Sequence, residues 1–100
     1  MRMKLMDGPY ERIVSGTKTV EIRLFDEKRQ KIKLGDIIEF ARLSDKATIK
    51  AEVIGLLRYN TFKDLLNDFK DEGSETELYK IYSKEQEQKY GVLGIKLNVK

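Results

Sequence analysis

The segment SGTKTVEIRL, Ser15–Leu24, joins a predicted helix to a predicted strand. Its second half has the period-two alternation of a β-strand, with apolar residues at Val20, Ile22 and Leu24 and polar ones at Thr19, Glu21 and Arg23. Gly16 stands where a helix commonly ends in a left-handed residue. We therefore predict a strand over 19–24 whose apolar face lies against the core and whose charged face points away from it.

The residues before this segment predict a helix over 7–16. Asp7 or Gly8 can cap its start, Pro9 suits the first turn, and Gly16 suits the end. The apolar residues fall at helical spacing, and the predicted buried stripe consists of Tyr10, Ile13 and Val14.

The residues after it predict further strands over 37–41, 48–57 and 92–99, with a bulge or bend at Gly55. Helices are predicted over 61–70, from about residue 75, and from about residue 84, each preceded by a capping residue. These caps are Thr61, Ser74 and Ser83. The residues predicted to face the core are Phe62, Leu65, Leu66 and Phe69 in the first helix, Leu78, Tyr79, Ile81 or Tyr82 in the second, and Leu93, Ile95, Leu97 and Val99 in the last strand.

This order of elements predicts a single domain over residues 1–100. Strands and helices do not alternate regularly, so a parallel α/β sheet is not favoured. We expect an α+β fold with a curled, mainly antiparallel sheet forming a small barrel and helices flanking it.

Composition excludes several kinds of chemistry. The chain has no cysteine and no histidine, which removes disulfides, thiolate nucleophiles, the usual zinc ligands and the commonest general base. We expect no metal and no cofactor. Because no apolar run could span a bilayer and no signal peptide is visible, we expect no membrane partner and a cytoplasmic location. The net charge of +3 and the pI of about 9.1 are compatible with a polyanion partner.

Lys18, Glu21 and Arg23 concentrate charge at the junction of helix and strand. From spacing alone, Glu21 and Arg23 form a lateral ion pair on a solvated face, worth about 0.2–1 kcal/mol if exposed. The alternative is that these side chains line a ligand site. Spacing alone favours the solvated ion pair, since outward charged positions are the norm on half-buried strands.

The same segment resembles the G-x-K-x-x-E-x-R signature of the activating-signal-cointegrator homology (ASCH) family. The resemblance extends through most of the chain. It includes the helix before the signature, the Gly35-Asp36 turn with the strand that follows it, and the closing stretch Tyr90–Ile95. ASCH domains are similar to PUA domains, so the resemblance implies a small β-barrel with a cleft beside it.

The resemblance also implies a role with RNA or with modified nucleosides, and it places Lys18, Glu21 and Arg23 in the cleft. A mixture of donors and acceptors suits a base or nucleoside better than bare phosphate. Cations for phosphate could come from the basic loop, at Arg29, Lys31 and Lys33. Tyr59 is the best candidate for stacking on a base. A monomer is favoured.

Two alternatives stay open. Some ASCH proteins are amidohydrolases that remove the acetyl group of 4-acetylcytidine, which implies catalytic roles for Lys18, Glu21 and a carboxylate at Asp71 or Glu72. In this chain Glu21 occupies the position of the family's catalytic Thr, and Thr19 is the nearest hydroxyl. The other alternative is a protein-interaction module that docks through the late helices.

Overall fold

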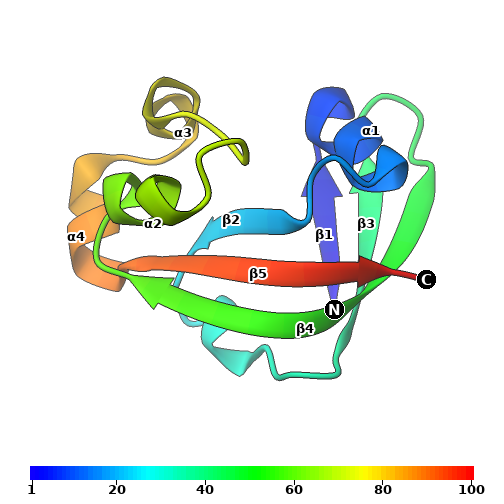
Figure 1. Cartoon of the computed structure of the whole chain (residues 1–100), viewed down its shortest axis with the longest axis horizontal. Coiled ribbons are helices and arrows are strands. Elements are labelled where there is room, and N and C mark those ends of the chain that lie inside the picture. The colour runs from blue at the N-terminus through cyan, green and yellow to red at the C-terminus, as the bar shows by residue number, and fades with distance from the viewer.

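The computed structural model describes residues 1–100 and contains one five-stranded sheet, four α-helices and a short 3-10 helix (Figure 1). The elements in chain order are β1 (Arg2–Leu5), α1 (Asp7–Ser15), β2 (Val20–Leu24), η1 (Arg29–Lys31), β3 (Ile37–Arg42), β4 (Thr48–Tyr59), α2 (Phe62–Asp68), α3 (Glu75–Ile81), α4 (Lys84–Tyr90) and β5 (Val92–Val99). None of these helices has the length and apolar character needed to cross a membrane.

The sheet is curled into a half-barrel. Its strand order is β1-β3-β4-β5-β2, and β1 pairs with β3 in parallel while every other pair is antiparallel. The predicted α+β, PUA-like class is confirmed. The sheet does not close into a complete barrel, because β1 and β2 remain as its two edges. Figure 1 shows α2, α3 and α4 gathered at one end, α1 at the other, and β2 running between them.

The predicted helix ends are confirmed. Gly16 has φ +83° and its N–H bonds the carbonyl of Ile13. The three predicted caps each accept a hydrogen bond from the backbone of the first turn, and Ser83 with Gln86 forms a complete capping box. The predicted bulge is also present, because the β4–β5 register shifts between Val53 and Gly55.

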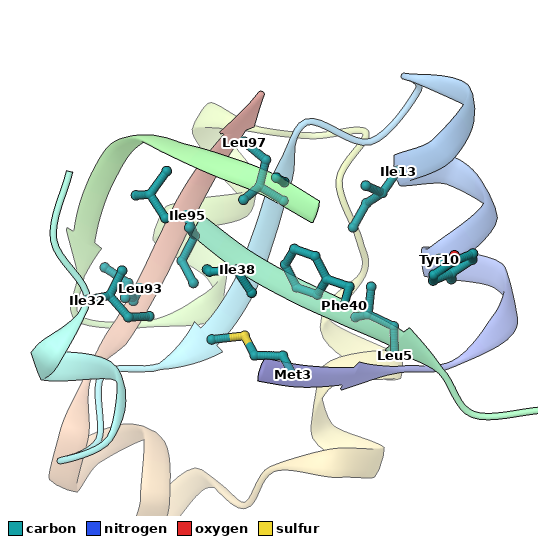
Figure 2. Packing of buried hydrophobic residues seen from close by; sticks show 12 residues of the cluster. Met3, Leu5, Tyr10, Ile13, Ile32, Ile38, Phe40, Leu93, Ile95 and Leu97 are labelled. Carbon is teal, nitrogen blue, oxygen red and sulfur yellow. The ribbon is translucent and has the colours of Figure 1, made fainter. Parts of the chain in front are cut away.

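Three side chains predicted to be buried are exposed: Val14, Ile81 and, at the end of β5, Val99. In α1 only the turn bearing Tyr10 and Ile13 faces the sheet, and Val14 lies beyond the edge of that contact. Figure 2 shows Tyr10 and Ile13 pointing from α1 toward the neighbourhood of Phe40 and Leu5.

The buried apolar side chains form two clusters on opposite faces of the sheet. The first has 12 residues, fills the half-barrel and includes Leu93, Ile95 and Leu97 of β5 (Figure 2). The second has 6 residues and lies between β2 and the helices α2 and α3.

β2 is covered on both faces. Its apolar face packs in the second cluster, under α2 and α3. On its other face, Glu21 lies opposite Ile95 and Arg23 opposite Leu93 in the β2–β5 ladder, and cross-strand partners share a face of the sheet. Because Ile95 and Leu93 belong to the first cluster, the charged face of β2 is turned toward the inside of the half-barrel. The expectation of a solvated charged face is wrong.

Candidate functional site

The site lies at the open edge of the sheet, where β2 has no neighbouring strand. The carbonyl of Thr19 accepts from the N–H of Leu97 in β5, and the N–H of Phe25 donates to Gly91, just before β5. Such bonds alternate along an antiparallel ladder. The N–H groups of Val20 and Ile22 therefore point to the open edge. Buried N–H groups need acceptors, and here carboxylates provide them.

A cleft of about 830 Å³ opens above this edge. One wall is formed by β1, the start of α1 and Arg12. The opposite wall is formed by the 71–74 loop, α3 and Tyr82. Lys18, Glu21 and Arg23 lie between the walls and form the cleft floor together with Glu72. The structure therefore brings the three signature residues together with Glu72, one of the two carboxylates considered from the sequence, which lies 49 positions beyond Arg23.

Lys18 is almost fully buried, with 5% of its side chain exposed. Its Nζ donates to the backbone carbonyl of Glu72 at 2.8 Å. The same Nζ lies 3.8 Å from Glu21 Oε1 and 3.8 Å from Glu72 Oε2. A single ammonium group thus faces two carboxylates that come from different elements.

Glu21 and Arg23 form a buried, two-point ion pair. Arg23 Nη2 and Nε donate to Glu21 Oε2 at 2.9 and 3.2 Å. The other carboxylate oxygen of Glu21 accepts from the backbone N–H of Ile22 at 3.2 Å. Arg23 Nη2 also donates to the carbonyl of Lys4 in β1 at 3.0 Å. The Arg23 side chain therefore connects the two edge strands across the opening of the sheet.

Glu72 connects the α2–α3 loop to the start of β2. Its Oε1 accepts from both the N–H and the hydroxyl of Thr19, each at 3.3 Å, and its Oε2 accepts from the N–H of Val20 at 3.4 Å. Asp71, the other carboxylate considered from the sequence, lines the cleft but makes none of these contacts. Of the two, Glu72 is the carboxylate next to Lys18.

Burial and neighbouring charges shift the protonation of two floor residues. Burial lowers the pKa of Lys18, and the nearby cations Arg12 and Arg23 act in the same direction, while the carboxylates of Glu21 and Glu72 oppose the change. Burial also acts to lower the pKa of Arg23, but Glu21 and the phenol of Tyr82 outweigh it and raise that pKa above its ordinary value. Arg23 is thus a permanent cation, whereas Lys18 loses its proton more readily than a free lysine.

Arg29, Lys31 and Tyr59 lie outside the cleft. Arg29 and Lys31 belong to η1, where Arg29 is paired with Asp26 at 3.1 Å. Tyr59 lines a second, shallower hollow of about 780 Å³ with Arg58, Lys89 and residues around them. The Tyr59 hydroxyl donates to Asp68 at 2.7 Å, which raises its pKa to about 12. The predicted RNA contacts therefore lie in three separate places: the cleft, η1 and the second hollow.

The cleft residues that were missed from the sequence include Lys4, Arg12 and Tyr82. Tyr82 was expected only to pack, and it does contact Phe62 in a stacked arrangement while also lining the cleft. Nothing in the local sequence marks Lys4 or Arg12, because their position depends on how β1 and α1 meet β2. No group of three or more acidic side chains is arranged to hold a metal ion.

The geometry can bind and polarise a neutral, polar ligand. The floor offers one ammonium and two carboxylates, all within a buried network where electrostatic interactions are stronger than in water. Exposed apolar side chains of Met6, Leu43 and Ile81 stand around it. This combination of polar floor and apolar sides is typical of sites for small organic ligands.

Comparison with protein families gives one match. The sequence profile of the ASCH domain matches residues 3–100, which is nearly the whole chain. No curated protein matches the chain.

Solved structures share the fold. The crystal structure of the hypothetical protein PH0355 is 34% identical, with a TM-score of 0.86, and the alignment covers 99% of this chain and 97% of that one. The solution structure of PF0455 from Pyrococcus furiosus is 29% identical, with a TM-score of 0.72 and coverage of 98% and 94%. The crystal structure of ASCH from Zymomonas mobilis is 20% identical, with a TM-score of 0.71, and covers 97% of this chain and 65% of that one. At this identity the last likeness shows the fold alone.

Proposed function

This chain belongs to the ASCH domain family, and on that premise we propose that its cleft binds a modified nucleoside, either free or within RNA. One observation supports the proposal most. Lys18 and Glu21 are buried on the floor of an open cleft of about 830 Å³, and the half-buried Glu72 lies beside Lys18. Charged groups are costly to bury, so such a cluster at the base of a cavity is a candidate for function.

The chemistry of the floor suits the polar edge of a base. A base edge carries both carbonyl oxygens, which accept hydrogen bonds, and amino groups, which donate them. Lys18 can donate to the former, while Glu21 and Glu72 can accept from the latter. The exposed apolar side chains of Met6 and Ile81 can contact the faces of the ring.

Arg23 acts in this proposal as a positioning residue. Two of its nitrogens are already bonded to Glu21, and one of these also bonds Lys4. It holds the Glu21 carboxylate in place and connects the two sides of the opening. Its contribution to binding is therefore exerted through Glu21, not through a direct contact.

Arg29, Lys31 and Tyr59 are proposed as secondary contacts, and only for RNA. They lie outside the cleft, in η1 and in the second hollow, so a single nucleoside in the cleft does not reach them. Loss of these side chains should weaken the binding of RNA but not of a free nucleoside.

The binding proposal is tested by amide NMR titration with 4-acetylcytidine and, separately, with a short RNA of mixed sequence. We expect shifts at residues 18–23 and 71–74. Lys18→Met should abolish them, and Lys50→Met, which removes an exposed cation from the sheet, should retain them. A well-dispersed spectrum for Lys18→Met checks that it is folded, and Glu21→Gln serves as the second variant if it is not. Shifts that are absent, or unchanged in both variants, would refute the binding proposal and favour a protein-interaction module.

Amide hydrolysis is a second candidate, favoured by the lowered pKa of Lys18 next to two carboxylates. Water adds to the acetyl carbonyl carbon, the bond from that carbon to nitrogen breaks, and the amine leaves with a proton, giving acetate and cytidine. Lys18 is suited to transfer that proton. The nucleophilic hydroxyl of other family members is replaced by Glu21, so water is the nucleophile in this account.

Turnover is tested by measuring acetate release from 4-acetylcytidine. Lys18→Met should abolish it. Thr19→Val separates two routes, because the Thr19 hydroxyl is bonded to Glu72 and could itself act as a nucleophile. Full activity in Thr19→Val supports water activation, and its loss supports the hydroxyl. No acetate release from the wild-type protein would remove the enzyme proposal and leave the binding proposal intact.

A further inference from the structure

The cations of the cleft fall into two groups with different availability. On the floor, Lys18 is buried and Arg23 is half-buried, and both are paired with carboxylates. At the rim, Lys4 and Arg12 are exposed, and their side-chain nitrogens make no salt bridge and no hydrogen bond within the fold. A ligand anion therefore meets paired cations at the bottom of the cleft and unpaired ones at its edge.

Both rim cations are held by the floor. The carbonyl of Arg12 accepts from the backbone N–H of Lys18 at 3.0 Å. The carbonyl of Lys4 accepts from Arg23 Nη2 at 3.0 Å. In each rim residue, a hydrogen bond from a floor residue thus fixes the carbonyl group next to the Cα atom that carries the side chain. The two cations come from different elements, α1 and β1, and line the same wall.

The two walls differ in charge. The wall that carries Lys4 and Arg12 has no acidic residue among its lining side chains, whereas the opposite wall carries Asp71 and Glu77. Glu77 is itself paired with Lys80. A dianion entering the cleft is attracted to the first wall and repelled by Asp71 on the second.

This arrangement matches the layout of a nucleotide. In a pyrimidine, the edge that carries the 4-amino group lies on the side of the ring opposite the ribose. A base whose polar edge meets the floor therefore leaves its ribose and 5′-phosphate near the rim. Phosphate is usually recognised by Lys and Arg side chains that are free to donate.

We infer that Lys4 and Arg12 form a phosphate subsite, so that the preferred ligand of the cleft is a nucleotide, either free or as a unit of an RNA strand, and not an uncharged nucleoside. The inference rests on the proposed function, since it assumes that a base occupies the floor. Beyond the proposed function, it specifies that the ligand carries a phosphate and that Lys4 and Arg12 select for it.

The test compares 4-acetylcytidine with its 5′-monophosphate by isothermal titration calorimetry on the wild-type protein. Two exposed cation–phosphate contacts should make the nucleotide bind about tenfold more tightly at low salt. The difference should shrink as ionic strength rises, because exposed charges are screened. Inorganic phosphate alone, as a third ligand, should bind far more weakly than the nucleotide.

Variants assign the effect to its residues. Lys4→Gln/Arg12→Gln should bring the affinity for the nucleotide down to that for the nucleoside. Lys50→Gln/Lys63→Gln removes the same charge from exposed cations outside the cleft, and it should leave the preference for the nucleotide in place.

The outcomes are distinguishable. Equal affinity of the wild-type protein for the two ligands would overturn the phosphate subsite and leave the proposed function standing. A preference for the nucleotide that persists in Lys4→Gln/Arg12→Gln would also overturn it. Failure of both ligands to bind would remove the proposed function, and the subsite with it.

Discussion

Arg23→Met tests whether the charged floor of the cleft is a buried network. The substitution keeps the approximate length of the side chain and removes two hydrogen bonds to Glu21 and one to the carbonyl of Lys4. Only 7% of the Glu21 side chain is exposed. Breaking a buried ion pair costs about 3–5 kcal/mol, because the remaining charge stays buried without its partner. Since Lys18 and the N–H of Ile22 still contact Glu21, we expect the lower end, about 3 kcal/mol.

The assay is urea unfolding at neutral pH, with thermal unfolding as a second measurement. A loss of about 3 kcal/mol should lower the Tm of a domain of this size by roughly 12–24 °C. The matched control is Arg42→Met. Arg42 makes a similar two-point pair with Asp45, at 2.9 and 2.7 Å, but 53% of the Asp45 side chain is exposed. Its loss should cost much less than that of Arg23.

Two further results bear on the same reasoning. Glu21→Gln/Arg23→Met should be less unstable than the sum of its single variants, because no uncompensated carboxylate remains. Acid should reduce the penalty of Arg23→Met, since a protonated carboxyl group is uncharged. The reasoning fails if Arg23→Met costs less than about 1 kcal/mol, the range of an exposed surface pair.

Alkaline stability, a tyrosine titration and a pair of glycines test other contacts of the fold. The pKa of Lys18 is lower in the folded than in the unfolded protein, so the unfolded state binds more protons between these two values. The stability of the wild type relative to Lys18→Met should therefore rise with pH in that window and level off above the unfolded pKa of about 10.4; a flat or falling difference in urea titrations would contradict this. Glu87→Gln should lower the pKa of Tyr79 from about 12, measured by NMR of ring-labelled tyrosine, and an unchanged value would show that Glu87 is not its cause. Gly16→Ala should cost about 1 kcal/mol because of its positive φ, whereas Gly8→Ala, which has open space around it, should not; equal effects in urea unfolding would argue against the helix end described.

The sequence predicts most elements because their signals are local. Gly16, Ser74 and Ser83 each act within one helical turn, and each ends or begins a helix as expected. The parallel pairing of β1 with β3 was not predicted, because it joins residues that are about 37 positions apart. No short pattern in the chain records such a pairing. Local patterns also fail at Val14. Its helical spacing fits the buried stripe, but the sheet does not extend far enough to cover its side chain, which is therefore exposed.

The candidate site was predicted in part. Alternation along β2 correctly puts Glu21 and Arg23 on one face, but it cannot tell what covers that face. The cover comes from the inner side of the half-barrel, and Glu72 of the 71–74 loop meets the strand at its open edge. This is why a pair that spacing assigns to the solvent is buried. Spacing therefore predicts the shared face of Glu21 and Arg23 but not the burial of that face.

Long-range contacts account for the rest. Glu72 reaches the start of β2 across more than 50 positions, and the sequence left it equivalent to Asp71. Arg29 and Tyr59 are suitable residue types for RNA, but residue type does not determine which surface they share. The fold places them away from the cleft.

The most direct test of the central claim is a crystal structure of the protein with 4-acetylcytidine 5′-monophosphate. The account predicts the base in the cleft, with its polar edge within hydrogen-bond distance of Lys18 and of Glu21 or Glu72, and its phosphate beside Lys4 and Arg12. A nucleotide seated instead in the hollow at Tyr59, or held in the cleft without any contact to Lys18, would contradict it.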